Sequence, residues 1–291
     1  MHSIVYVTLV YSVHCVPKSK ILDCIPAKKN IMVSDISKFK HGFLYLTLGA
    51  YFVWVLATYF LEGRILTLLR PEAVADRIVY IIVANILIGI LLALWVARKG
   101  IRLQITTKES TGFRTIGRTI VAVIIGFILG LIFFLAQNPA SLDPIILLNL
   151  YAQVFTGTVA EIAVCWVVIG ASFEGFTRKH GRVVSIIVGI IVASILFGVY
   201  HIGHSPPFNQ PMTIAFLSLI GVLTSLVYFI GRDVYATIAF HNFLGVYGVM
   251  QALSAAGALA SYQTPRIPLI GFALVSLIVF ILMDALYVRK A

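Results

Sequence analysis

The chain has 291 residues, of which 60% are hydrophobic and only 11% are charged. Soluble domains carry roughly 45–50% apolar and about 25% charged residues, so this composition excludes an ordinary water-soluble protein and indicates an integral membrane protein. The net charge of +11 lies in short clusters between long apolar runs, which indicates membrane topology and argues against nucleic-acid binding. Cys15, Cys24 and Cys165 form no CxxC motif, so neither a disulfide framework nor a thiolate zinc site is predicted.

Residues 1–41 precede the first long apolar segment and are expected to form an N-terminal cytoplasmic extension, for which disorder is one interpretation. The apolar run 3–16 is shorter than the roughly 20 residues that span a bilayer. Its lysines follow the run, whereas a signal peptide carries its positive charges first. Met1 and Met32 are both candidate starts of the chain. We expect residues 42–291 to form a single membrane domain.

Eight apolar segments follow, all rich in Ile, Val, Leu, Phe and Gly. They show no strand-like alternation, so helices must satisfy the backbone hydrogen bonds within the bilayer. The predicted fold is therefore all-α, a polytopic integral membrane protein with about eight transmembrane helices. We place the segments at 42–61, 78–97, 116–136, 144–172, 183–203, 211–230, 233–259 and 267–288.

The loops between these segments differ in charge. The loops 98–118 and 178–182 and the C-terminal tail are basic, and eight spans place all three on one side with the lysine-rich N-terminal residues. The positive-inside rule then predicts a multi-pass protein with both termini in the cytoplasm. Gly126 and Gly130 form a GxxxG motif, which predicts close contact between two helices.

Three of the ionisable residues in the predicted spans stand out, because burial in a bilayer costs several kcal/mol unless the group is paired or hydrated. Glu161 lies in the fourth span, His201 ends the fifth and His241 lies in the seventh. Such a carboxylate acts as a general base, while imidazoles orient water or stabilise an oxyanion. Alternatively the three residues are zinc ligands with an open fourth position. Both arrangements lead to hydrolysis, whereas a structural Glu–His pair between helices would lead to none.

Two further ionisable residues have simpler explanations. His204 would share a helix face with His201, but Pro206 and Pro207 should end the helix nearby. His204 is therefore only a possible supporting residue of the site. Asp284 lies near the end of the last span and is expected to reach the interface. We expect the site to lie in the middle to inner part of the bilayer, with the fourth and fifth helices extending into the cytoplasm.

The FxxxH at Phe197–His201, a glutamate one span earlier and a histidine on a later span resemble the CAAX-processing endopeptidase and bacteriocin-immunity family of intramembrane proteases. That family has eight helices and three motifs, usually EExxxR, FxxxH and HxxxN. The resemblance covers about residues 145–260, which we take as the protease core. It implies a peptide hydrolase with Glu161, His201 and His241 as catalytic residues. The partners it implies are membrane lipids and a membrane-anchored protein or peptide substrate.

Two of the three motifs depart from the family pattern. Ala160 precedes Glu161 where the family has two glutamates, so Glu161 aligns with the second, and Cys165 stands in the arginine position. Gly245 takes the place of the last asparagine, and Asn242 is a possible supporting amide about 100° round the helix. The chain is then either a variant protease or an inactive pseudoprotease acting as a scaffold or immunity factor. A small transporter is a third hypothesis, although the internal symmetry of many transporters is not found.

Overall fold

The computed structural model describes the backbone of residues 26–291 and the side chains from His41 onward. The chain divides between His41 and Gly42. The core and the site described below belong to the compact unit Gly42–Ala291. Of the predicted N-terminal extension, residues 1–25 lie outside the described residues, and the chain is helical from Pro26. Every regular element between residues 26 and 291 is a helix, and the described chain contains no strand. The predicted all-α fold is therefore confirmed.

Seven helical segments of the described chain are long and apolar enough to cross a membrane. The remaining predicted span, 233–259, forms helix α9, whose His241, Asn242 and Gln251 make it less apolar than the others. The protein is thus an integral multi-pass membrane protein. The segments are His41–Gly63 (the end of α1, Pro26–Thr58, with η2, Tyr59–Gly63), Val74–Arg102 (α2, Val74–Tyr80; η3, Ile81–Leu92; α3, Ala93–Arg102), α4 (Ile116–Ala136), Pro144–His180 (α5, Pro144–Glu161; η4, Ile162–Gly170; α6, Ala171–Thr177; η5, Arg178–His180), Arg182–Gly203 (α7, Arg182–Tyr200; η6, His201–Gly203), α8 (Pro211–Gly231), α9 (Val234–Ala255) and Ile267–Val288 (α10, Ile267–Met283; η8, Asp284–Val288).

Helix starts follow capping rules. Asp143 caps α5 by accepting hydrogen bonds from the backbone N–H groups of Ile145 and Ile146, and Pro144 occupies the first turn. Asp233 caps α9 through the N–H of Ala236. Both carboxylates satisfy N–H groups that have no partner within the helix. The α5 and α9 starts are therefore well defined, and these two helices carry Glu161 and His241 of the candidate site.

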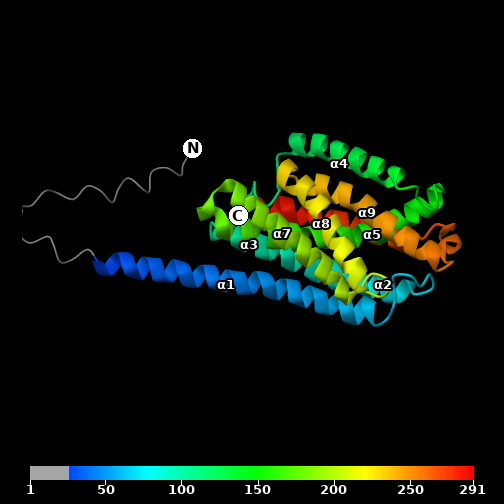
Figure 1. Cartoon of the computed structure of the whole chain (residues 1–291), viewed down its shortest axis with the longest axis horizontal. Helices are drawn as coiled ribbons and strands as arrows, with labels where there is room; N and C mark the ends of the chain where they lie inside the picture. The colour runs from blue at the N-terminus through cyan, green and yellow to red at the C-terminus, as the bar shows by residue number, and fades with distance from the viewer. Residues whose placement is uncertain (1–25) are drawn as a thin grey trace, which may run out of the picture. The chain divides into compact units, whose positions relative to one another are not determined.

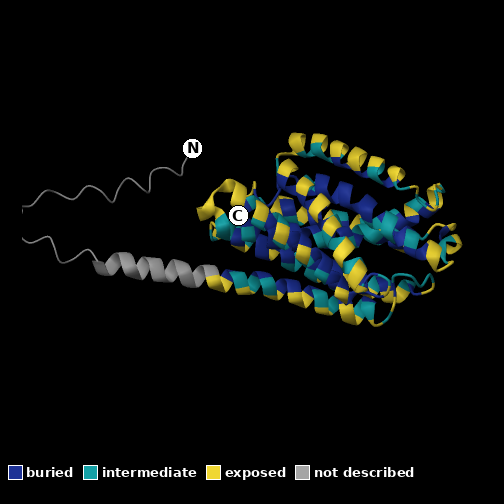
Figure 2. Ribbon diagram, viewed as in Figure 1, coloured by how far each residue is buried: buried dark blue, intermediate teal, exposed yellow. Residues whose placement is uncertain are grey.

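Helix α9 lies at the centre of the unit, between α4, α5 and α8. Gly126 of α4 lies against the Ala236 carbonyl, and Gly130 lies against Phe240 and Phe243. The GxxxG motif thus lets α4 approach α9 closely, as predicted. Figure 2 shows α9 largely buried and the outer face of α4 exposed. That outer face consists of Ile, Val, Leu and Phe side chains, as expected of a surface that contacts lipid.

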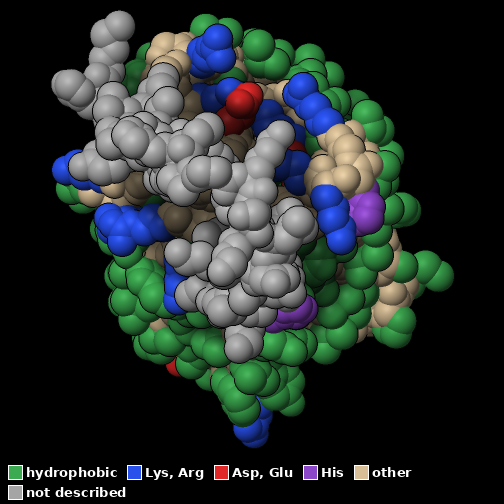
Figure 3. All heavy atoms as spheres, turned by 90° about the vertical axis from the view of Figure 1, so that its left-hand side faces the viewer, with side chains coloured by type: hydrophobic (Ala, Val, Ile, Leu, Met, Phe, Trp, Pro, Cys, Tyr) green, Lys and Arg blue, Asp and Glu red, His purple; other side chains and the backbone are tan. Residues whose placement is uncertain are grey.

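The loops gather at two opposite ends of the unit. At one end, Lys108 donates a hydrogen bond to the Arg289 carbonyl, and Arg114 donates one to the Arg232 carbonyl. Arg232 also forms a buried bidentate ion pair with Glu174, with N–O distances of 2.6 and 2.9 Å. We call this the basic end; Figure 3 shows Lys and Arg side chains at several places around it. The loops 64–73, 137–143, 204–210 and 256–266 lie at the other end.

The segment Pro144–His180 has 37 residues and is about 55 Å long. This exceeds the roughly 30 Å hydrocarbon core of a bilayer. Glu161 lies near its middle, and the basic-end half continues through α6 to His180. Arg182 then begins α7, which returns along the same half to His201. The extra length of both helices at the basic end brings Glu161 and His201 to one level.

Candidate active site

Glu161 and His241 form a buried pair between α5 and α9. Glu161 Oε2 lies 3.2 Å from His241 Nε2, and both side chains are largely inaccessible. The other ring nitrogen, His241 Nδ1, lies 2.7 Å from the Thr224 hydroxyl of α8. Because that hydroxyl donates to the Ile220 carbonyl, it must accept a hydrogen bond from Nδ1–H. Nε2 therefore contacts the Glu161 carboxyl through a single shared proton.

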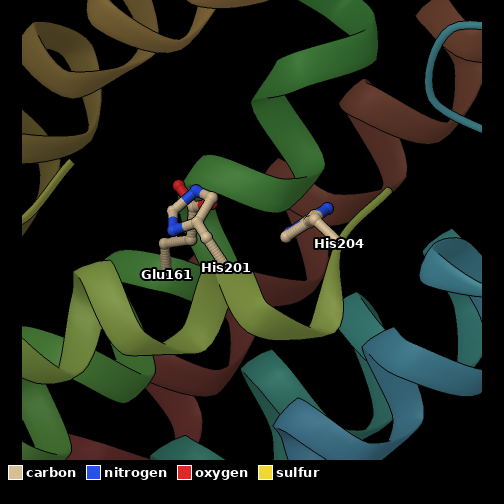
Figure 4. A group of neighbouring side chains, drawn as sticks. All are labelled: Glu161, His201 and His204. Carbon is tan, nitrogen blue, oxygen red and sulfur yellow. The ribbon is translucent and has the colours of Figure 1, made fainter. Parts of the chain in front are cut away.

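His201 follows α7 at the start of a single 3-10 turn. Its Nδ1 lies 2.8 Å from the Phe197 carbonyl, which only accepts hydrogen bonds, so Nδ1 donates and Nε2 is left as an acceptor. The Phe197 ring packs between the rings of His201 and His241, with centroid distances of 4.9 and 5.0 Å. Figure 4 shows the His201 ring beside the Glu161 side chain. Phe197 of the FxxxH motif thus positions His201 through its carbonyl, and its ring packs against both His201 and His241.

A second buried cluster adjoins this pair and contains a residue that sequence reasoning missed. Glu62 accepts hydrogen bonds from the backbone N–H and the hydroxyl of Ser205. His204 Nδ1 lies 3.0 Å from Glu62 Oε2, and His204 Nε2 contacts the Tyr200 hydroxyl. Tyr200 in turn lies 3.3 Å from the hydroxyl of Tyr80. Glu62 follows an apolar span directly and resembles an ordinary loop carboxylate in sequence, but its side chain is fully buried.

The structure also brings together a possible set of metal ligands. Ligand atoms of Glu161, His201 and His204 lie within 4.8 Å of one another. The zinc set expected from sequence contained His241 in place of His204. His204 Nε2 contacts the Tyr200 hydroxyl, and Nδ1 lies 3.0 Å from Glu62 Oε2, so His204 would have to leave Tyr200 to bind a metal through Nε2. The donor set suits zinc in residue type, but its present contacts favour a hydrogen-bonded cluster.

A cavity of about 530 Å³ connects the site with the end opposite the basic end. Glu161, His201 and His241 line its deep part, and the loops containing Leu68 and Phe208 line its outer part. Gly157, one helical turn from Glu161, also lines it, and a side chain there would enter open space. Most of the lining is apolar, so the cavity suits a ligand with hydrophobic groups around a few polar contacts.

The eroded motif positions have structural explanations. Ala160 is fully buried against Gly89 of η3 and does not line the cavity, whereas Glu161 does. A side chain at Gly245 would collide with Val154. Asn242, the possible supporting amide, is buried away from the cavity, where it accepts from the Thr158 hydroxyl and donates to a backbone carbonyl of α5. Asn242 therefore holds α9 against α5 and contributes no group to the cavity.

Fold and site together define an intramembrane protein with a glutamate and histidines from three helices at the base of a cavity. Residues 142–247 match the family model described as "Type II CAAX prenyl endopeptidase Rce1-like". This match confirms the resemblance to the CAAX-type intramembrane proteases that the sequence motifs indicated, and it contains Glu161, His201, His204 and His241. No curated protein and no solved structure gives a significant match to the chain.

Proposed function

We propose that this protein is an intramembrane endopeptidase of the CAAX type, which hydrolyses membrane-associated peptides or proteins with a water activated by Glu161. The observation that carries the proposal is the contact of Glu161 with His241, beside His201, at the base of a membrane-embedded cavity. A carboxylate in such a site removes a proton from water as the water attacks the peptide carbonyl. It then returns that proton to the leaving amine.

The two histidines have different roles in this proposal. The free Nε2 of His201 accepts a hydrogen bond from the attacking water and so orients it, because Nδ1 is already bound to the Phe197 carbonyl. His241 shares a proton with Glu161 through Nε2. When Glu161 turns to the water, this N–H donates to the oxyanion that develops on the substrate carbonyl. Thr224 keeps the His241 ring in the required orientation.

The substrate is a membrane-associated protein or peptide cut near its lipid anchor or at a membrane terminus. With both termini in the cytoplasm, as the basic loops predict, the cavity extends toward the extracytoplasmic side. A reporter fused after Lys290 should then report the cytoplasm, and one near Asn138 should report the opposite side. Finding both reporters on one side would contradict this orientation.

The decisive experiment compares the purified protein with its Glu161→Gln variant on a fluorogenic S-farnesylated CAAX peptide. The amide keeps the shape of the side chain but accepts no proton, so hydrolysis should fall by about 10²–10⁴-fold with binding retained. Glu72→Gln, at an exposed carboxylate, is the matched control and should cleave normally. Equal cleavage by Glu161→Gln and the parent would refute the mechanism. Peptide binding without cleavage by the parent would instead support the pseudoprotease alternative.

A further inference from the structure

Asn85 and Thr156, like Thr67, line the cavity with side-chain polar groups that have no hydrogen-bond partner among the residues that the structure describes. Asn85 of η3 is 1% exposed, and neither its amide oxygen nor its amide nitrogen has a hydrogen-bond partner. Thr156 of α5 is also 1% exposed, and its hydroxyl has none. Both residues line the same cavity as Glu161. An unpaired buried polar group costs about 1–3 kcal/mol, and a ligand that pairs with these groups removes that cost.

Contacts between the helical segment of Asn85 and α5 place Asn85 and Thr156 at one level. Arg77 donates a hydrogen bond to Gln153, with an N–O distance of 2.9 Å, and twelve residues later Gly89 packs against Ala160. The helical segment that contains Asn85 therefore runs parallel to α5. Asn85 lies four residues before Gly89 on its helix, and Thr156 lies four residues before Ala160 on α5. The two residues thus lie at one level on the lining of the cavity, about 7.5 Å along the α5 axis from Glu161 toward the outer part of the cavity.

We propose that Asn85 and Thr156 form a subsite that binds the backbone of an extended peptide substrate next to the bond cleaved at Glu161. A side-chain amide offers two donors and one acceptor, and a hydroxyl offers one donor and two acceptors. Together they match the N–H and C=O of one peptide group. The inference rests on the proposed function, because it takes the cavity to be a substrate site.

The geometry of the cavity gives this subsite its register. An extended peptide advances about 3.3 Å per residue. The five residues from Thr156 to Glu161 cover about 7.5 Å along the helix, so the subsite lies about two peptide residues from the cleaved bond. Gly157 lies between Thr156 and Glu161, and the space beside it is open. A substrate chain therefore has room to pass from the subsite to Glu161 without displacing a side chain.

The subsite also supplies an amide that the last motif lacks. A side chain at Gly245 would meet Val154, and Asn242 is occupied between α9 and α5. Asn85 lines the cavity, and neither its amide oxygen nor its amide nitrogen has a hydrogen-bond partner among the described residues. Its polar group reaches the substrate from η3 and not from α9.

The test measures peptide binding in the Glu161→Gln background, where cleavage does not intervene. The probe is a fluorescent S-farnesylated CAAX peptide, and the variants are Asn85→Leu and Thr156→Val. Each should weaken binding about three- to tenfold, as expected for loss of one hydrogen bond. Thr47→Val is the matched control, because Thr47 also has a buried unpartnered hydroxyl but does not line the cavity. It should leave binding unchanged.

A second measurement identifies the bound peptide group. Peptides in which one backbone amide is replaced by an ester lose one N–H donor, and one such peptide should bind the Glu161→Gln protein more weakly by a similar factor. The Asn85→Leu or Thr156→Val change should abolish that difference. If Asn85 and Thr156 had only a structural role, the substitutions would change the melting temperature, but the difference in affinity between the amide and ester peptides would remain.

The outcomes separate this inference from the proposed function. Unchanged affinity in both Asn85→Leu and Thr156→Val, or no ester position with an effect, would overturn the subsite while leaving hydrolysis by Glu161 to its own test. Absence of peptide binding by the Glu161→Gln protein would also overturn the subsite. Weakened binding in a protein whose parent never cleaves would support the subsite and refute the protease.

Discussion

A close approach of two helices beside the site makes a quantitative prediction at Gly89. A methyl group at this position would overlap with the Ala160 methyl, which is fixed directly to the α5 backbone and has no rotamer to adopt. Overpacking of this kind costs about 1–3 kcal/mol. Replacing glycine by alanine within a helix returns up to about 1 kcal/mol of helix propensity. The control is Gly271→Ala in α10, which carries the same propensity gain but meets open space.

The difference in stability between Gly89→Ala and Gly271→Ala isolates the overlap. At roughly 2–4 °C per kcal/mol for a chain of this size, Gly89→Ala should melt roughly 2–12 °C below Gly271→Ala in the same detergent. Hydrolysis should fall by about 10²-fold if Glu161, the neighbour of Ala160, moves by about 1 Å. Thermal unfolding and cleavage of the farnesylated peptide provide the two measurements. Equal melting temperatures for the two variants would refute the packing argument.

Two further predictions concern the eroded motif and the metal alternative. Ala160→Glu should destabilise the protein and give no gain in cleavage, because the new carboxylate would be buried against Gly89 without a partner; a more active variant would show that this position faces the site. Zinc chelators should leave cleavage unchanged, since His204 is held by Glu62 and Tyr200. Loss of activity on chelation with recovery on added zinc would instead favour the metal set of Glu161, His201 and His204.

The membrane-spanning helices could be predicted well from the sequence because hydropathy is a strong, local signal. The predicted segment 116–136 agrees with α4 (Ile116–Ala136) at both ends. The seventh span was also predicted, although α9 is less apolar than its neighbours. Glu161, His201 and His241 could be identified because ionisable residues are rare in the bilayer. Their close approach in the structure agrees with that reasoning.

Other features depend on helix rotation and on tertiary contacts, which hydropathy does not report. Ala160 and Glu161 are adjacent in sequence, but Ala160 faces a neighbouring helix and Glu161 faces the cavity. Glu62 looked like one of several balanced loop charges, yet its carboxylate is buried against Ser205 and His204. Asn85 carries no charge and lies within an apolar run, so only its unpartnered amide in the structure singled it out.

The central claim is that Glu161 acts with His241 as one catalytic unit. A double-mutant cycle on kcat/KM tests it most directly, with Glu161→Gln, His241→Ala and the combined variant assayed on the farnesylated peptide. Each single change should lower kcat/KM by about 10²–10⁴-fold. The combined change should lower it little further, because residues that act as one unit give non-additive losses. Losses that multiply in the combined variant, or a Glu161→Gln protein that cleaves like the parent, would contradict the account.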